Sequence, residues 1–449
     1  MNNFRDLDSI YNKKAKLYKN IKIEKKVEIC DLTLEADGEE MAGLKFKESE
    51  RLEIAKLLDE VGAHRIAIIG NSPKPTKGDI KSAEKILDLN LNARTNGFVK
   101  TEEEILTCQK IGLKEVVILV GINETAFTKN ISPNDILEKS KRLIEYAKSL
   151  GLHVTFMGMD STRTSPIYLK KIITKLEPLF DEYVIGDSLG RITPYGIEYL
   201  VKLIKKWTNK PIHLHPHNTT SLAVANSLSG VLSGLSVVHT TVNGLGEFSG
   251  LAATEELSAA IDIHAGISLG LNYSKLQEAS SLVSRITGIQ NPPFKPITGK
   301  SAFAIPETEE TQEFMYNLSL ENKIFEGMPI PPKLVGKNII FSIGKKCNEF
   351  TVLYNLKECG YEITKKDNIK VVEMITDLTL FDDKVEYNLY LEQVDLPNLR
   401  ASIKSINSIG SFNKAGSLKS ARTEFLEGNI ERATRFERIE TLITDINPN

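Results

Sequence analysis

Three histidines at alternate positions are the residues whose types and spacing most directly suggest chemistry. They lie in the segment His213-Leu214-His215-Pro216-His217. Because side chains two residues apart in a strand point to the same face, a strand here would turn all three imidazoles one way. Two imidazoles at this spacing can chelate one divalent ion, while the alternative is a polar strand end with satisfied hydrogen bonds. The spacing predicts a metal site on His215 and His217, and His213, deeper along the strand, is expected to be structural.

A carboxylate would complete a facial set with these histidines. Asp31 ends the apolar run Val27–Asp31, which we predict to be a strand. Alternate strands of a barrel contribute to the same inward layers, so a first and a seventh strand can bring Asp31 to the histidines. Nitrogen and oxygen donors without a thiolate favour Zn²⁺ or Mn²⁺, with Mg²⁺ and Fe²⁺ as further options.

The elements that must position these residues recur as βα units. Eight short, mostly apolar runs alternate with amphipathic segments, as expected of parallel strands covered on both faces. Helical segments end near Gly62 and Gly151, where a helix C-cap needs a left-handed residue. The pattern predicts an α/β fold, a (β/α)8 TIM barrel, with an open doubly wound sheet as the alternative. The strands are expected at Val27–Asp31, Arg65–Gly70, Leu91–Thr95, Glu115–Gly121, His153–Met159, Tyr183–Asp187, Pro211–His217 and Ser236–Asn243.

The rest of the chain is expected to flank this barrel. We place a Lys-rich N-terminal extension at residues 1–25 and the barrel at 26–290. Prolines then punctuate the chain, which predicts a linker subdomain at 291–332. Residues 333–449 are expected to form a smaller C-terminal α+β subdomain.

Composition narrows the class of partner. The 57 Lys and Arg residues nearly balance the 59 Asp and Glu residues, so we expect binding neither to nucleic acid nor to an anionic membrane. The four cysteines contain no Cys-x-x-Cys pair, which favours reduced thiols. The N-terminal residues lack the apolar stretch of a signal peptide. We therefore expect a cytoplasmic protein whose partners are small molecules.

Several separate motifs support a more specific expectation. The motifs are Asp31–Leu34 followed by Gly38, Asp160–Thr164, Gly186–Gly190, His215–Asn218, Leu222–Ser227, Thr241–Glu247 and Gly299–Ala304. In this order they resemble the isopropylmalate, homocitrate and citramalate synthase family, which is related to hydroxymethylglutaryl-CoA lyase. The likeness spans residues 25 to about 345. It implies a divalent metal on Asp31, His215 and His217 that chelates a 2-oxo acid, with an acyl-CoA such as acetyl-CoA as co-substrate.

The sequence departs from the family pattern at residues that act on the acyl-CoA or support the metal. An arginine expected after the first strand falls at Glu35 or Ala36, an asparagine that supports the metal falls at Leu251, and Phe248 replaces another arginine. Beyond the barrel, Ile305–Glu310 replaces a histidine-containing stretch. These departures imply an altered substrate, because an electrostatic donor at the reacting carbonyl is worth several kcal/mol.

The expected function is a divalent-metal-dependent condensation of an acyl-CoA with a 2-oxo acid. The alternatives are an aldolase or lyase that cleaves a hydroxy or oxo acid, and a degenerate subunit that binds metal or ligand without turnover. The expected catalytic residues are Glu35, Arg94, Arg163, Asp187 and Glu310, and the expected substrate-binding residues are Thr33, Asp160, Thr164 and Asn243. The base is left open among Glu35, Asp37, Asp187 and Glu310, and the substitute for the arginine among Arg94, Arg163 and Lys45.

The resemblance also implies a homodimer formed through the region after the barrel. We expect light scattering of the purified chain at micromolar concentration to give twice the chain mass of 50.0 kDa. A strictly monomeric species at these concentrations would contradict this expectation.

Overall fold

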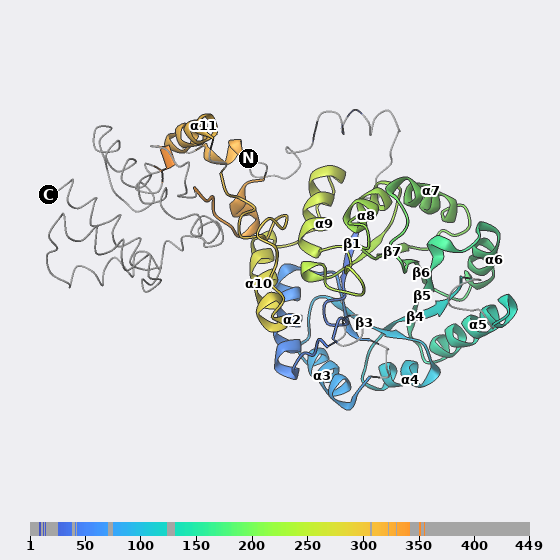
Figure 1. Ribbon diagram of the computed structural model, residues 1–449. Coiled ribbons are helices and arrows are strands. Elements are labelled where there is room, and N and C mark those ends of the chain that lie inside the picture. Colours follow the sequence, from blue (N-terminus) through green and yellow to red (C-terminus); the bar gives the residue numbers. More distant parts are fainter. Residues whose placement is uncertain are drawn as a thin grey trace, which may run out of the picture. The chain divides into compact units, whose positions relative to one another are not determined.

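The structure is a computed structural model that describes most of the first 341 residues. Eight parallel strands close into a barrel in chain order, so the predicted TIM barrel is confirmed (Figure 1). The strands are β1 (Glu28–Asp31), β2 (Arg65–Ile69), β3 (Arg94–Val99), β4 (Glu115–Gly121), β5 (His153–Met159), β6 (Glu182–Asp187), β7 (Ile212–Pro216) and β8 (Val237–Thr240). The described residues are 26–37, 41, 43–70, 75–123, 131–305, 308–321, 323–328, 330–341 and the isolated positions 9, 12, 14, 350, 351 and 354.

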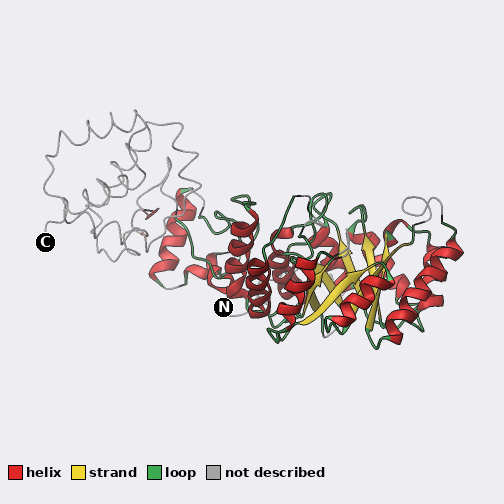
Figure 2. Ribbon diagram, turned by 90° about the horizontal axis from the view of Figure 1, so that it is seen from below, coloured by secondary structure: helices red, strands yellow, loops and turns green. Residues whose placement is uncertain are grey.

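Helices surround the strands, as Figure 2 shows. Gly62 ends α2 in the left-handed conformation (φ 90°), and Gly151 has the same hand just after α5, as their places in the sequence predicted. The helices are α2 (Glu48–Val61), α3 (Lys77–Leu87), α4 (Glu102–Lys110), α5 (Pro133–Ser149), α6 (Pro166–Leu176), α7 (Pro194–Ile204), α8 (Ala223–Leu232), α9 (Thr254–Ala260) and α10 (Leu276–Thr287).

The third strand begins three residues later than predicted. It was expected at Leu91–Thr95 but runs Arg94–Val99, and Ala93 before it is held by a bond from its N–H to the carboxylate of Asp59 (2.8 Å). Gly97 weakens the strand pattern in the sequence, yet the fold requires it, because a Cβ there would lie 2.8 Å from Cys108 Sγ of α4. Arg94 is therefore the first residue of the strand, whereas the prediction placed it next to the last.

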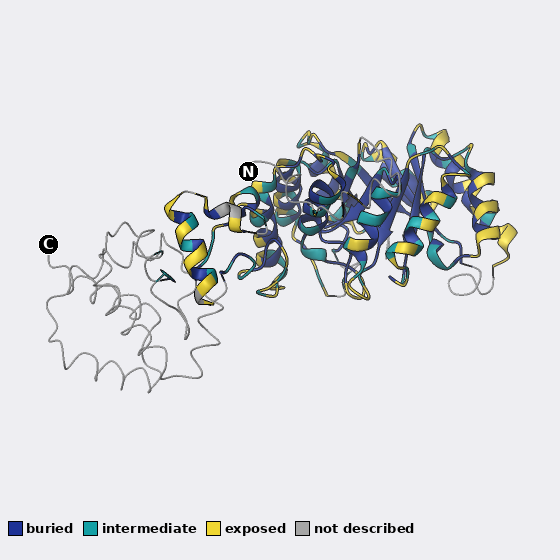
Figure 3. Ribbon diagram, turned by 90° about the horizontal axis from the view of Figure 1, so that it is seen from above, coloured by how far each residue is buried: buried dark blue, intermediate teal, exposed yellow. Residues whose placement is uncertain are grey.

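The barrel interior changes character along its axis. Alternate residues of the strands point inward and form an apolar cluster between the two ends of the barrel, and Figure 3 shows the strands mostly buried. The cluster consists of Cys30, Leu32, Ala67, Phe98, Val117, Leu119, Met157, Val184, Val237 and Leu251. Outward-facing strand residues such as Ile66, Ile118 and Ile185 join the larger core beneath the helices.

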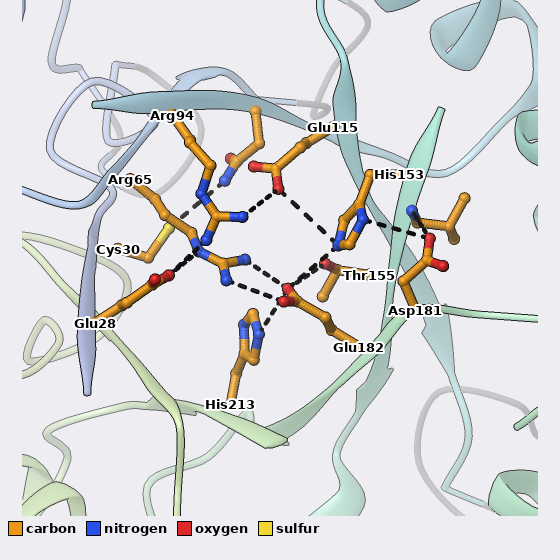
Figure 4. A network of polar contacts seen from close by, with 12 residues as sticks. Glu28, Cys30, Arg65, Arg94, Glu115, His153, Thr155, Asp181, Glu182 and His213 are labelled. Atoms are coloured by element: carbon orange, nitrogen blue, oxygen red, sulfur yellow. Dashed lines mark hydrogen bonds and ion pairs between the residues drawn. The ribbon is translucent and has the colours of Figure 1, made fainter. Parts of the chain in front are cut away.

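Charged side chains fill the amino end of the barrel (Figure 4). The guanidinium of Arg65 binds both carboxylate oxygens of Glu182 (2.5 and 3.0 Å) and reaches Glu28 (2.8 Å). Arg94 binds Glu28 (2.5 Å) and Glu115 (3.2 Å). Two-point pairing of a buried guanidinium and carboxylate offsets the cost of removing both charges from water.

A second compact unit begins with the residues that follow the barrel. It comprises Pro292–Lys295, Gly299–Pro332 and Lys337–Asn449, and within it lies α11 (Glu309–Leu320). Lys337 Nζ donates to the carbonyl of Gly299 (2.6 Å) inside this unit. Nearly all of the C-terminal subdomain expected at 333–449 lies outside the described residues, so its fold stays a prediction. Among the described helices, none has the length and apolar character needed to cross a membrane.

The charged layer predicts acid sensitivity. Burial alone would raise the pKa of Glu28, but Arg65, Lys26 and Arg94 outweigh it and lower the pKa from 4.5 to about 2. A carboxyl whose pKa is lower in the folded state stabilises that state above its unfolded pKa and loses this contribution as the pH falls. We expect the free energy of unfolding, measured in urea, to decrease from pH 4.5 to pH 2. The decrease should be shallower in Glu28→Gln, and an unchanged slope in that variant would contradict the assignment.

Candidate active site

Two buried imidazoles lie together at the carboxyl end of β7. His215 and His217 are 4% and 5% exposed, and their ring centres are 5.2 Å apart. Burial lowers the pKa of His215 well below its usual value and lowers that of His217 to about 4. Nδ1 of His217 has no hydrogen-bond partner among the described residues. At neutral pH both rings are uncharged, so each keeps one nitrogen lone pair for a ligand.

A third imidazole supports the first of them from the neighbouring strand. Nδ1 of His239, on β8, lies 3.2 Å from Nδ1 of His215, and Nε2 of His239 lies 3.3 Å from Nδ1 of His213. No motif in the sequence pointed to His239. His239 lies two residues after Val237, which faces the barrel interior, and it is on the strand next to β7. These two signals would have placed it beside the other histidines.

Asp31 does not join the histidines. Cys30 and Leu32 point into the barrel, so the alternation of the strand turns the intervening Asp31 to the other face. Its two carboxylate oxygens accept hydrogen bonds from the backbone N–H of Thr33 (2.9 Å) and from the hydroxyl of Thr254 at the start of α9 (2.6 Å). The expected role of Asp31 as third metal ligand is replaced by a structural one.

The loop after β1 brings buried and paired side chains to this end of the barrel. Glu35 and Ala36 are 3% and 0% exposed. Asp37 is bound to Arg51 of α2 (2.7 Å), which also donates to backbone carbonyls of the loop and of β2. Lys45, a candidate for the missing cation, is exposed. Of the carboxylates considered as base in this loop, Glu35 is the buried one.

The ends of β5 and β6 form a closed polar cluster. Arg163 binds both oxygens of Asp160 (2.8 and 2.5 Å), and Thr164 donates to the carbonyl of Asp160 (3.0 Å). Asp187 accepts from Thr162 (2.7 Å), and its burial raises its pKa. The structure gathers these predicted site residues at one edge of the barrel, and Asp160 and Arg163 are paired with each other, whereas Oδ2 of Asp187 is buried with no hydrogen-bond partner among the described residues.

Two expected substrate-binding residues hold the scaffold. The amide of Asn243 donates to the carbonyl of Ser280 and to the hydroxyl of Ser284, both on α10 (3.0 and 3.1 Å). Thr33 accepts the backbone N–H of Val242 (2.8 Å). Both side chains tie the loop after β8 to its surroundings, and their substrate-binding role stays a prediction.

Two expected catalytic residues are not among those at the carboxyl ends of the strands. Arg94 is at the amino end of β3, opposite the histidines, where it pairs with Glu28 and Glu115. The prediction placed Arg94 near the carboxyl end of the third strand. This was wrong because the predicted strand began three residues too early. Glu310 is exposed near the start of α11 in the second unit. The structure does not join Arg94 to the histidine pair, and the role of Glu310 stays a prediction.

Apolar side chains adjoin the histidines where the family pattern has polar ones. Leu251 is 1% exposed, packs into the barrel interior and bridges to the backbone of His217. Phe248 is 71% exposed, and its ring centre lies 5.9 Å from that of His217. The surroundings of the imidazoles are therefore more apolar than the family pattern implies.

Comparison with known proteins decides the family. The HMGL-like family model matches residues 26–283 of the chain. The chain belongs to the HMGL-like family. A probable 2-isopropylmalate synthase of Archaeoglobus fulgidus is 33% identical over 369 residues, which cover 79% of this chain and 72% of the relative. The homocitrate synthase AksA of Methanothermobacter thermautotrophicus is 32% identical, over 82% of this chain and 92% of the relative.

A solved structure shares the barrel. The HMG-CoA lyase of Bacillus subtilis matches with a TM-score of 0.52 and 20% identity, covering 65% of this chain and 99% of that chain. The predicted family and the prediction of a synthase- or lyase-type enzyme are confirmed. Members of this HMGL-like family generally use a divalent metal and acyl-CoA substrates.

The described donors do not fit an ion held by three protein side chains. His215 and His217 supply two nitrogens, but Asp31 faces away from them. Nowhere in the described part of the chain do three His, Cys, Asp or Glu side chains gather closely enough to hold a metal ion. The described residues therefore support no chemical step that depends on a metal ion.

The structural role of Asp31 can be separated from metal binding. Asp31→Ala removes the acceptor of two buried donors, and we expect it to lower the free energy of unfolding by about 1–3 kcal/mol. The affinity for Zn²⁺ or Mn²⁺, measured by titration calorimetry on folded protein, should stay unchanged. Loss of metal affinity at unchanged stability would restore Asp31 as a ligand.

Proposed function

We propose that the enzyme forms a carbon–carbon bond between an acyl thioester and a 2-oxo acid, and that its substrate pair is more apolar than those of its named relatives. The observation that carries this proposal is the pair of buried, neutral imidazoles next to Leu251 and Phe248, at the carboxyl ends of the strands. In TIM-barrel enzymes this end of the barrel holds the active site. The names of the relatives, 2-isopropylmalate, homocitrate and (R)-citramalate synthases, support the reaction class.

The histidines suit binding better than proton abstraction. An imidazole with a pKa of about 4, as in His217, is a weak base at neutral pH, whereas catalytic bases work best with a pKa near the operating pH. The same ring can still donate its N–H to the carbonyl or carboxylate oxygen of an oxo acid, since both oxygens accept hydrogen bonds. We assign His215 and His217 to holding the 2-oxo acid.

We assign the proton-abstracting role to Glu35. It is buried in the loop that follows β1, in the segment where the family pattern has its arginine. Removal of a proton from the acyl carbon next to the thioester carbonyl would create the nucleophile that attacks the carbonyl carbon of the oxo acid. The carbonyl oxygen takes up a proton as the carbon–carbon bond forms, and water then cleaves the thioester and releases the free thiol. Glu35→Gln keeps the size of the side chain and removes the base, so turnover should fall by about 100- to 10,000-fold with folding preserved.

The substrate preference is tested by release of free thiol from acyl-CoA. We expect little turnover of acetyl-CoA with 2-oxoisovalerate or 2-oxoglutarate, because loss of one charge-stabilising donor slows such a reaction by about 100- to 1,000-fold. Longer acyl-CoAs, or oxo acids with larger apolar side chains, should react faster. Turnover of either ordinary pair at about 1–10 per second would contradict the altered specificity.

Matched variants separate binding from chemistry. His217→Asn should weaken oxo-acid binding, whereas Phe248→Arg should move the preference toward dicarboxylic oxo acids. The exposed Phe314 of α11 offers a control, since Phe314→Arg adds the same charge in the second unit. Binding of an oxo acid by calorimetry without turnover of any pair would favour the alternative of a ligand-binding subunit.

A further inference from the structure

The side chain of Arg51 reaches from α2 into the loop that follows β1. Arg51 is buried, and its Nη1 donates to the carbonyl of Leu34 (3.1 Å) and to Oδ2 of Asp37 (2.7 Å). Its Nη2 donates to the carbonyl of Ile68 on β2 (2.7 Å). One guanidinium therefore joins a helix, the loop and the neighbouring strand by three hydrogen bonds.

The two loop contacts lie on either side of Glu35. Leu34 is the residue before it, and Asp37 is two residues after it. The N–H of Glu35 donates to the carbonyl of Leu32 (2.9 Å), which closes a turn between the two contacts and the end of the strand. The backbone on both sides of Glu35 is therefore held in place, and the position of its side chain depends on Arg51.

Asp37 is the charged anchor of the loop. Its second oxygen, Oδ1, accepts the backbone N–H of Phe46 (2.8 Å), just before α2 begins. The side chains of Arg51 and Asp37 are only 4% and 9% exposed, and removing one partner of a buried ion pair is strongly destabilising. Asp37 is thus committed to the structure of the loop and does not compete with Glu35 as the base.

The burial of Arg51 gives it an indirect role. Both of its terminal nitrogens are bonded to protein acceptors, and its Nε is buried without a hydrogen-bond partner among the described residues. This guanidinium presents no surface to a substrate. A lysine could not replace it, because a single ammonium nitrogen cannot span acceptors in the loop and on β2 that the planar fork of the guanidinium reaches together.

We propose that Arg51 is a positioning residue that holds the loop after β1 and thereby fixes the carboxylate of Glu35. The catalytic consequence rests on the proposed function, in which Glu35 is the base, whereas the control of the loop by Arg51 does not. A displacement of a reacting group by about 1 Å can slow a reaction by about 100-fold. Small movements of this loop would therefore alter turnover without loss of the fold.

Hydrogen exchange of the full chain tests the control of the loop. Arg51→Lys keeps the positive charge but cannot make all three bonds. The backbone N–H groups of Glu35 and Ala36 should therefore exchange about 10-fold faster, as expected when a buried hydrogen bond is lost locally. Those of α5 should keep their wild-type rates. Unchanged rates in the loop, or an equal rise in the loop and in α5, would overturn the proposal.

Two further variants test the route of this control. Asp37→Asn leaves Arg51 in place but removes the charged anchor, so it should also speed exchange in the loop. Arg285→Lys is the matched control, because Arg285 binds Glu53 of the same helix at the surface (2.8 Å) and should leave the loop unchanged. Wild-type exchange in Asp37→Asn, or fast loop exchange in Arg285→Lys, would count against the assigned contacts.

Kinetics connect the loop to catalysis. If a reactive substrate pair is found, Arg51→Lys should lower kcat by about 10- to 100-fold with little change in KM. In the Glu35→Gln background the same substitution should have no further effect on kcat, because the base that it positions is already absent. A loss of kcat that multiplies in the double variant overturns the action through Glu35. If no pair reacts with the wild type, the proposed function fails, but exchange in the loop still decides the role of Arg51.

Discussion

The buried pair of Arg65 and Glu182 is the interaction on which the interior of this barrel depends. The eight strands enclose a narrow interior. At the amino end of the barrel this interior contains charged side chains. Removing one partner of such a pair strands the other charge out of water, at a cost of about 3–5 kcal/mol. The two-point contact between them therefore fixes Arg65 on β2 and Glu182 on β6 across the barrel, with Glu28 and Arg94 at the rim.

Strand alternation is the second constraint, and it decides which predicted residues can act. Inward positions alternate, so His213 and His215 share the interior with Cys30 and Leu32, whereas Asp31 cannot. The sequence alone does not show whether a carboxylate near a strand end points into the barrel or toward the helices. The inward face was read correctly on β7, where three histidines reinforce one another, and wrongly on β1, where a single aspartate left the parity undetermined.

The fold could be predicted from the sequence because it repeats. Seven of the eight strands lie within about two residues of their expected starts, since each is an apolar run followed by an amphipathic helix, and some of these helices have a glycine just after their end. The third strand was placed too early because Gly97 interrupts its pattern. That error of three residues moved Arg94 from one end of the barrel to the other. Errors in strand boundaries therefore matter more for a site than for a fold.

The supports of the site could not be predicted from local sequence. His239 and Glu182 are separated from His215 by 24 and 33 positions, and no spacing rule connects them. They meet because β6, β7 and β8 are neighbours and because inward residues of adjacent strands lie at similar heights. The apolar replacements at Phe248 and Leu251 change only what surrounds the imidazoles on the open side. His239 contacts His215 from inside the barrel (3.2 Å), so the surroundings on the open side can change in polarity while the position of the His215 ring is maintained.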